Sequence, residues 1–451
     1  MRPIDAIAEA DETVRYRTEL DAVAAQPWPY PEGRFAGRGI VICGGGDTYF
    51  PCAWVCIGML RRVGCTLPIE LWYRGPSEMT EAMLAIMHAA DVVCVDAYEV
   101  ARRVKFRRLD SWELKPFAIA NCSFEQLLYL DADNVPVQDP APLFNSFEFD
   151  QTGAIFWPDR YTGVNAAQEW LKRSAWDICG VPFRVEPECE SGQLLIDKRK
   201  CWPALMLCLH INERSDFYYA HFYGDKDTFR LAWHRMDVPF TLVPYPVRTL
   251  GESDVIVQHD FDGKALFQHR NGDKFSLSRR PRHVRGFRNA EACEQLLSEL
   301  SRRWHPPVRS LPADFARAEA DAYAAVCAIG WFSYSVEGQK PRMLELRPDF
   351  SIGRGRGTME FGWMIEEDKD GEAVLSIRNA HGPTCFLRLH DDGVWRGRWR
   401  VYERGRVSVR PGAQALADRD VDCSEGALRD PQFVKSLGCA LRKCWRVVTG
   451  G

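Results

Sequence analysis

The sequence lacks any long hydrophobic run: no stretch approaches the roughly 18 consecutive apolar residues of a membrane-spanning helix, so no transmembrane segment is expected. An excess of charge of one sign is also missing. The formal net charge of −4 offers no general attraction to nucleic acid or to an anionic membrane. Residues 1–20 are charged and lack the apolar centre of a signal peptide. We therefore expect a cytoplasmic protein without a nucleic-acid partner.

Paired cysteine motifs are missing as well, although the chain has 16 cysteines. They stand singly in apolar segments such as 40–43 and 92–95. Cys52 with Cys56, and Cys439 with Cys444, have no matching second pair, which argues against a structural zinc site. Free buried thiols in a reducing compartment explain this distribution better than disulfides.

The length and composition predict a globular protein with more than one domain. At 451 residues, with 46% hydrophobic and 27% charged residues, the chain is too long for one ordinary core. We predict an N-terminal helical segment over 1–30, an α/β domain over 31–310, and a β-rich accessory domain with a C-terminal helix over 313–451. The proline-rich stretch that begins at Trp304 supplies the linker.

The α/β domain alternates short apolar segments with segments of helical spacing. Strands are predicted at 39–43, 67–73 and 91–95, and helices lie between them. This alternation predicts a mainly parallel, doubly wound sheet.

The accessory domain has short strand-like segments between residues 342 and 410, separated by Gly and Asp turns. Their spacing predicts a small antiparallel sandwich or barrel. Trp395 and Trp399 lie on one face of a predicted strand. They either fill the core of this domain or stack on sugars.

Two carboxylates follow the most apolar strand of the chain. Leu127–Leu130 predicts a strand buried on both faces, and Asp131 and Asp133 come directly after it. Residues i and i+2 of an extended chain point the same way, so both acids can face one hard cation. Pro136 then turns the chain, which leaves the acids at the carboxyl edge of the sheet, where α/β folds bind ligands. A turn capped by Asp is the alternative interpretation.

Several motifs occur together in one order. They are 112–119 (WELKPFAI), 129–136 (YLDADNVP), 139–140 (DP), 143–144 (LF), 153–159 (GAIFWPD), 190–197 (ESGQLLID) and 267–271 (FQHRN). This set resembles the fungal-type α-mannosyltransferases, which have the GT-A nucleotide-diphospho-sugar transferase fold. The resemblance covers roughly residues 38–290 and does not extend to the last third of the chain. It implies a hexosyltransferase with retention of configuration, acting in glycan or polysaccharide synthesis.

The resemblance also implies ligands. The donor is a nucleotide-diphospho-sugar, GDP-mannose or a UDP-hexose, and the acceptor is a hydroxyl of a saccharide or glycoconjugate. The cation is Mn²⁺ (or Mg²⁺), and Mn²⁺ suits an imidazole ligand better. The predicted metal ligands are Asp131, Asp133 and His269.

Further site residues follow from the same comparison. Predicted donor contacts are Gly44, Gly45, Asp47, Lys115, Asp131, Gly192, Gln193, Lys226, Arg270 and Lys274. Glu190 is predicted beside the anomeric carbon, and Asp225 or Asp227 as the group that binds or deprotonates the acceptor hydroxyl. Asp159 is predicted to bind the acceptor. The alternatives are a surface turn at Glu190, a helix cap at Asp225 and a strand-end turn at Asp159.

Two other functions are compatible with these residues. A nucleotidyltransferase that makes nucleotide sugars also places acids at the end of an α/β sheet, and it would release pyrophosphate. A non-catalytic carbohydrate-binding protein would rely on the accessory domain instead.

Overall fold

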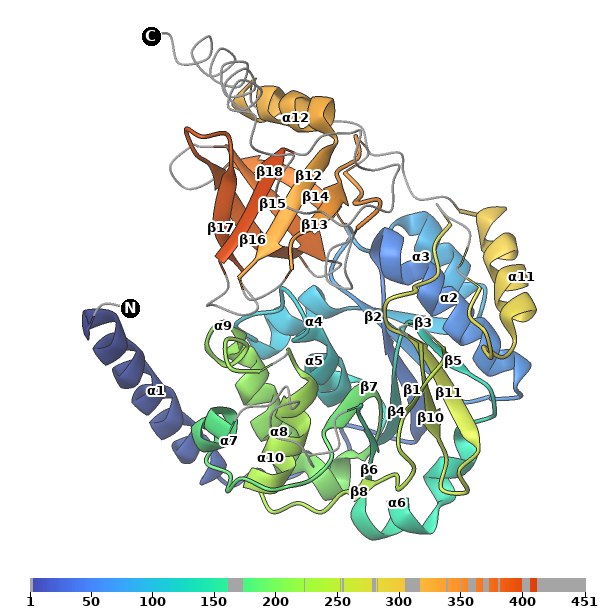
Figure 1. Ribbon diagram of the computed structural model, residues 1–451. Coiled ribbons are helices and arrows are strands. Elements are labelled where there is room, and N and C mark those ends of the chain that lie inside the picture. Colours follow the sequence, from blue (N-terminus) through green and yellow to red (C-terminus); the bar gives the residue numbers. More distant parts are fainter. Residues whose placement is uncertain are drawn as a thin grey trace. The chain divides into compact units, whose positions relative to one another are not determined.

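The protein is described here by a computed structural model covering residues 3–160, 173–222, 224–251, 253, 255–277, 281, 283–304, 317–337, 340–348, 350–355, 362–367, 373–379, 382–399 and 406–411. It divides into two compact units, Met1–Pro306 and Pro307–Gly451 (Figure 1).

The first unit is built on a seven-stranded sheet in the order β3-β2-β1-β4-β7-β6-β8. The strands are β1 (Arg38–Cys43), β2 (Ile69–Tyr73), β3 (Val92–Asp96), β4 (Gln126–Asp131), β6 (Ala154–Pro158), β7 (Cys189–Asp197) and β8 (Thr241–Leu242). The first four are parallel to one another, whereas β7 runs antiparallel to both β4 and β6. This confirms the predicted α/β class with a mainly parallel sheet.

Helices cover both faces of the sheet (Figure 1). One face carries α2 (Gly46–Arg62), α3 (Glu81–His88) and α11 (Ala290–Ser301), and the other carries α5 (Leu114–Asn121), α8 (Lys198–Glu213) and α10 (Lys226–Arg235). Alternation along β1 sends Val41 into one apolar core and Ile40 and Ile42 into the other. Strands buried on both sides have continuous apolar runs, so the arrangement is doubly wound, as predicted.

The remaining helices of this unit are shorter or peripheral. They are α1 (Pro3–Ala24), α4 (Ala97–Val104), α6 (Phe147–Thr152), α7 (Arg173–Cys179), α9 (Ser215–Tyr218) and a 3-10 turn, η1 (Ala141–Asn145). The first helix ends at Ala24, before the predicted residue 30, and Trp28 then donates its indole N–H to the carbonyl of Val23 at 3.1 Å. None of the helices in the described ranges combines the length and hydrophobicity required to span a bilayer.

A second, four-stranded sheet lies beside the first, in the order β5-β11-β10-β9. Its strands are β5 (Asn134–Pro136), β9 (Arg248–Thr249), β10 (Val255–His259) and β11 (Ala265–Arg270). In the antiparallel pairing of β5 with β11, Asn134 is opposite His269. The pairing therefore carries the late segment 265–270 directly to the residues that follow Asp131 and Asp133.

One of the alternative interpretations is wrong in a way that affects the site. A surface turn at Glu190 was one interpretation of the sequence, but Glu190-Ser191-Gly192 lies inside β7. A register shift between Phe156 and Trp157 lets β6 continue to pair with β7 as far as Cys189. Because the pairing extends this far, Glu190 is held by sheet hydrogen bonding rather than in a surface turn.

The second unit contains an antiparallel sheet in the order β13-β12-β18-β17-β16-β15-β14, as the sequence predicted. Its elements are α12 (Arg317–Ile329), β12 (Trp331–Val336), β13 (Arg342–Glu345), β14 (Gly362–Glu367), β15 (Ala373–Asn379), β16 (Gly382–Leu389), β17 (Trp395–Trp399) and β18 (Arg406–Pro411). Bridges at Leu346–Ile352 and Ser351–Gly362 connect the region after β13 to the start of β14.

Trp395 is 4% exposed and packs in the core of this unit, so the core-filling interpretation is confirmed for it. The side chain of Trp399 and the predicted C-terminal helix lie outside the described residues. The thirteen cysteines in the described ranges are free thiols, in line with the sequence analysis.

Candidate active site

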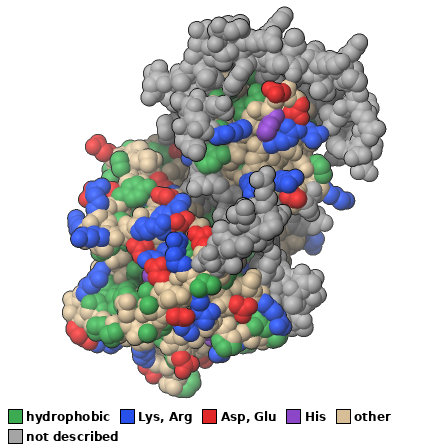
Figure 2. Space-filling model, turned by 90° about the vertical axis from the view of Figure 1, so that its left-hand side faces the viewer, with side chains coloured by type: hydrophobic (Ala, Val, Ile, Leu, Met, Phe, Trp, Pro, Cys, Tyr) green, Lys and Arg blue, Asp and Glu red, His purple; other side chains and the backbone are tan. Residues whose placement is uncertain are grey.

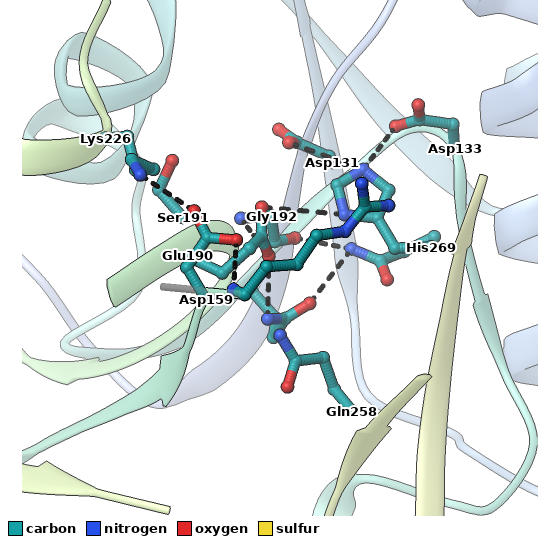
Figure 3. Close-up of polar contacts among 12 residues, drawn as sticks. Asp131, Asp133, Asp159, Glu190, Ser191, Gly192, Lys226, Gln258 and His269 are labelled. Atoms are coloured by element: carbon teal, nitrogen blue, oxygen red, sulfur yellow. Dashed lines mark hydrogen bonds and ion pairs between the residues drawn. The ribbon is translucent and has the colours of Figure 1, made fainter. Parts of the chain in front are cut away.

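Four predicted site residues converge at the carboxyl edge of the main sheet. Asp131 ends β4, Asp133 follows in the turn, Glu190 comes from β7 and His269 from β11. The Nε2 atom of His269 is 3.1 Å from Asp133 Oδ1 and 3.8 Å from Asp131 Oδ2, and its Nδ1 atom is 3.6 Å from Glu190 Oε1. The imidazole thus lies between carboxylates on both of its nitrogen sides (Figure 3).

Two backbone features bring the imidazole to this position. The amide of Arg270 donates to the carbonyl of Asp133 at 3.0 Å, which ties β11 to the acidic turn. A Cβ atom on Gly192 would lie 2.4 Å from Cε1 of His269 and 2.8 Å from Oε2 of Glu190. Only a glycine leaves room for the ring against this strand.

The charges in this cluster perturb one another strongly. Burial alone would lower the pKa of His269, but the carboxylates of Asp133 and Glu190 raise it to about 10. Burial would raise the pKa of Asp133, yet Lys274 and His269 hold it well below its ordinary value. Burial also opposes ionisation of Glu190, and His269 again dominates and lowers its pKa. Both acids are therefore carboxylates, and their negative charge keeps the imidazole of His269 protonated at neutral pH.

Lys115 stands at the centre of a second set of contacts. Its ammonium donates to the carbonyl and the hydroxyl of Ser191, both at 2.9 Å, and lies 3.2 Å from Asp131 Oδ1 and 3.2 Å from Asp225 Oδ2. The side chain is only 9% exposed. The predicted donor contact of Lys115 stays a prediction, because the protein itself already surrounds this ammonium with acceptors.

Asp225 occupies the N-cap position just before α10, but its side chain makes no capping hydrogen bond. Its Oδ2 atom instead accepts from the hydroxyl of Ser191 at 3.2 Å and faces Lys115. Burial raises the pKa of Asp225 to about 6, with Lys115 opposing the shift. The capping alternative is therefore wrong for Asp225, and the carboxylate is part of the cluster around Asp131.

The neighbours of Asp225 have other partners. Lys226 Nζ lies 2.7 Å from Asp159 and 2.6 Å from Glu188, and Asp227 is fully buried beside Arg230 at 3.3 Å. The structure thus joins Lys226 to Asp159 (Figure 3). The phosphate contact predicted for Lys226 and the acceptor roles predicted for Asp159 and Asp227 are not among these contacts and stay predictions.

Two basic residues, Arg270 and Lys274, follow His269, and their side chains have different partners. Lys274 contacts Asp133 and also lies over the ring of Tyr49, 5.2 Å from its centroid. The Nε of Arg270 donates to the carbonyl of Asp273 at 2.6 Å, and its guanidinium packs against the rings of Phe275 and Phe287. Of the two, Lys274 is the one that the fold brings to the acidic cluster.

The glycine turn after β1 lies on the same edge of the sheet. Gly44 donates its amide to the carbonyl of Trp72 at 3.0 Å, and a Cβ on Gly45 would lie 2.9 Å from the side chain of Glu78. Asp47 is in the first turn of α2. Gly44, Gly45 and Asp47 therefore sit where the first strand meets its helix, the place predicted for the nucleoside.

Sequence analysis missed three residues that hold the site together. Tyr129 donates its hydroxyl to Asp131 Oδ1 at 2.7 Å, and its position two residues earlier on the same strand face was the available signal. Asn134, fully buried, donates to the carbonyl of Gly192 and to Gln193 Oε1 at 3.4 Å. Ser191 bridges Lys115 and Asp225, and nothing local in the sequence indicates that role.

The carboxylate of Glu190 is oriented by two hydrogen-bond donors from its own strand. Its Oε2 atom accepts from the amide of Gly192 and from Nε2 of Gln193, both at 2.9 Å. These two donors leave Oε1 directed to His269 Nδ1, which is buried and has no hydrogen-bond partner within the described structure. Gln193, predicted to contact the donor, thus contacts Glu190 in the structure.

The donor set fits a divalent cation. In the described residues, Asp131, Glu190 and His269 each offer one ligand atom, and these atoms lie within 4.8 Å of one another. Asp133 lies closer still to His269 Nε2. Two or more carboxylates with one imidazole suit Mn²⁺ better than Mg²⁺, which prefers oxygen ligands alone. The structure thus adds Glu190 as an alternative to the predicted trio of Asp131, Asp133 and His269.

Comparison with known proteins places these residues in a family context. The family model described as "Mannosyltransferase putative" matches residues 37–171 and 183–270. The alpha-1,2-mannosyltransferase MNN5 of Saccharomyces cerevisiae is 29% identical over 300 residues, covering 53% of this chain and 50% of the relative. The alpha-1,2-mannosyltransferase MNN24 of Candida albicans is 28% identical over 271 residues, covering 51% and 38%. The chain thus spans half or less of the length of these curated relatives.

Among solved structures, the mannosyltransferase Ktr4p from S. cerevisiae in complex with GDP has 12% identity and a TM-score of 0.31, covering 50% of this chain and 76% of that one. The main sheet, with β7 antiparallel to β4, has the mainly parallel α/β form that the resemblance predicted. The matched residues end at 270, so the second unit lies outside them.

Proposed function

Since the chain belongs, through residues 37–270, to this mannosyltransferase family, we propose that it is a metal-dependent glycosyltransferase. It transfers mannose from GDP-mannose to a hydroxyl of a saccharide or glycoconjugate acceptor, with retention of configuration. The relatives that support this activity are alpha-1,2-mannosyltransferases, of which the chain covers only a part.

One observation supports the proposal above the others. Carboxylates from β4, β7 and the turn after β4 meet an imidazole from β11 at the carboxyl edge of the sheet. Side chains that arrive from distant segments and perturb one another's pKa values in this way are typical of functional sites. A purely structural ion cluster has no need of an imidazole flanked by carboxylates on both nitrogen sides.

A divalent cation, when bound, would counter the negative charge that develops on the departing diphosphate. Asp131, Asp133 and His269 would hold it. Glu190 would accept a hydrogen bond from Nδ1 of His269, which fixes the tautomer in which Nε2 is free to act as ligand. Lys274 adds positive charge beside Asp133, at the edge where a diphosphate would approach.

Asp225, with Lys115 beside it, would act on the acceptor hydroxyl. With a pKa of about 6, Asp225 is mainly a carboxylate at neutral pH and can take a proton from a hydroxyl. The ammonium of Lys115 lies 3.2 Å from an oxygen of Asp225 and from an oxygen of Asp131, so it reduces the electrostatic repulsion between these two carboxylates. In a retaining transfer, Glu190 would face the oxocarbenium-like centre; in an inverting one, Asp225 would act as the base.

A donor screen tests the proposal. Purified protein is incubated with GDP-mannose, UDP-glucose, UDP-galactose or UDP-N-acetylglucosamine, with Mn²⁺ or with EDTA, and nucleoside diphosphate release is measured. We expect Mn²⁺-dependent release from GDP-mannose, and Asp133→Ala is expected to abolish it. Full activity of Asp133→Ala or in EDTA would contradict the metal-dependent mechanism.

The same assay separates the alternative enzymes. Pyrophosphate release from GTP and mannose 1-phosphate, without nucleoside diphosphate release on adding an acceptor, would indicate a nucleotidyltransferase instead.

A further inference from the structure

The second unit exposes a strip of arginines on three adjacent strands. Alternation along β16, β17 and β18 turns Cys385, Leu387, Trp395, Val407 and Val409 into the core. The opposite face carries Arg388, Arg396, Arg398, Arg406 and Arg410, which we call the arginine face. All but the half-buried Arg396 are exposed. Figure 2 shows Lys and Arg side chains gathered on the described part of this unit.

The strand register sets like charges opposite one another. Arg398 is directly opposite Arg406, and Arg388 is directly opposite Arg396. Two like charges facing each other across neighbouring strands destabilise a sheet. Two such pairs lie side by side in this sheet. Because they lower its stability, folding alone does not account for them.

Carboxylates among the described residues meet part of this charge, and Oε2 of Glu337 accepts a hydrogen bond from the backbone amide of Arg406 at 3.1 Å. Arg396 pairs with Asp392, with Nη1 2.8 Å from Oδ1. Within the described ranges, no ion pair joins Arg398, Arg406 or Arg410 to a carboxylate. Since the whole chain has a formal net charge of −4, this positive charge is local and marks one surface.

The other side chains of the arginine face are of kinds that contact sugars. Ser333 is opposite Arg410, and Ser335 is opposite Ser408, so hydroxyls lie between and beside the guanidinium groups. Phe386, which is opposite Arg398, is 38% exposed and ends the row with an aromatic ring. Hydroxyls can bond to sugar hydroxyls, and an aromatic ring can stack on the apolar side of a pyranose.

We propose that the arginine face binds an anionic saccharide, one that carries sulfate, phosphate or carboxylate groups. The planar guanidinium of arginine pairs with such groups through two parallel hydrogen bonds. A membrane would need more exposed apolar side chains than one phenylalanine. Single-stranded nucleic acid would call for several aromatic rings on which bases stack. The proposal does not depend on catalysis by the first unit.

Binding to defined probes tests this inference with the full-length chain. Fluorescently labelled heparin dodecasaccharide and polygalacturonate dodecasaccharide are the anionic probes, and maltoheptaose is the neutral one. A single-stranded DNA dodecamer and phosphatidylserine vesicles represent the other polyanions. Affinities are measured by anisotropy or sedimentation at two salt concentrations.

We expect an anionic saccharide to bind, maltoheptaose not to bind, and the affinity to fall with salt. Arg398→Glu/Arg406→Glu should weaken saccharide binding at least about tenfold, since two paired contacts become repulsive. Arg285→Glu/Arg302→Glu, which changes the same charge on exposed residues of the first unit, should stay within about twofold of wild type.

Folding of the variants is checked by circular dichroism and by Mn²⁺-dependent donor hydrolysis, which neither pair should change. If the glutamate pair fails to fold, Arg398→Ser/Arg406→Thr replaces it, because small polar residues are tolerated in exposed strand positions. Equal saccharide binding by wild type and the arginine-face variant would overturn the proposal. DNA or vesicle binding as tight as that of the best saccharide would also overturn it.

Discussion

Gly192 offers the sharpest test of how the site is built, because one added methyl group meets the imidazole directly. In Gly192→Ala the Cβ atom would lie 2.4 Å from His269 Cε1, 2.5 Å from Nδ1 and 2.8 Å from Glu190 Oε2. Carbon atoms in contact are about 3.5–4.0 Å apart, so the ring has to retreat by about 1 Å or more. The variant therefore displaces His269 and Glu190 without removing either.

The expected loss follows from this displacement. A coordinating imidazole that is moved or loses its orienting partner typically weakens metal binding by about 10–100-fold, or about 1.4–2.8 kcal/mol. Overpacking of a buried contact costs folding stability in addition, by about 1–3 kcal/mol. We expect both effects in Gly192→Ala. Free Mn²⁺, followed by electron paramagnetic resonance during a titration, gives the affinity, and thermal unfolding gives the stability.

Gly39→Ala provides the matched control. Its Cβ atom would lie 2.3 Å from Cζ of Phe124, so the overlap is as severe, but Gly39 is at the start of β1 and Gly44 follows the strand's other end. This control should lose stability and keep the wild-type Mn²⁺ affinity. If Gly192→Ala binds Mn²⁺ as tightly as Gly39→Ala does, the imidazole is not part of a cation site.

Three more predictions follow from the contacts. The pKa of Asp225 rises from 3.8 to about 6 on folding, so its ionisation removes up to about 3 kcal/mol of folding stability as the pH rises through that range. Asp225→Asn should therefore flatten the pH dependence of the thermal unfolding temperature between pH 4 and 7. The same pH dependence in the variant and the wild type would contradict this. Lys226→Met leaves Asp159 and Glu188 buried without their shared cation, so urea unfolding should show a loss of about 3–5 kcal/mol that Lys226→Arg partly restores. Tyr129→Phe removes the 2.7 Å hydrogen bond to Asp131. It should weaken Mn²⁺ binding several-fold and lower the free energy of unfolding by about 1 kcal/mol. An unchanged Mn²⁺ titration would mean that Asp131 does not need this hydrogen bond to bind the ion.

Much of the first unit could be predicted because its signals are local. A strand buried on both faces needs an unbroken apolar run, and β1 and β4 each have one. The acids at the end of β4 were visible for the same reason, since a carboxylate next to such a run has to leave the core. Residues at i and i+2 share a face whatever the rest of the chain does, so Asp131 and Asp133 were expected together.

Other features depended on contacts that no local pattern reveals. The strand boundary at Cys189 depends on a register shift in β6, and it decides that Glu190 points to His269 rather than to solvent. Lys226 meets Asp159 and Glu188, partners that no local pattern indicates, because a buried ammonium requires carboxylates nearby. Core and surface were the two interpretations of Trp395, and only the pairing of β17 with β16 and β18 placed it inside.

The sequence by itself determined the α/β class, the acidic strand end and the family resemblance, because periodicity and short motifs are properties of neighbouring residues. Only the tertiary structure decided which charges meet. It brought His269 to Asp133 through the β5–β11 pairing, placed Lys115 between Asp131 and Asp225, and set Arg398 opposite Arg406. Electrostatic interactions depend on distance in space, and residues far apart in the chain come within a few ångströms only after the strands have paired.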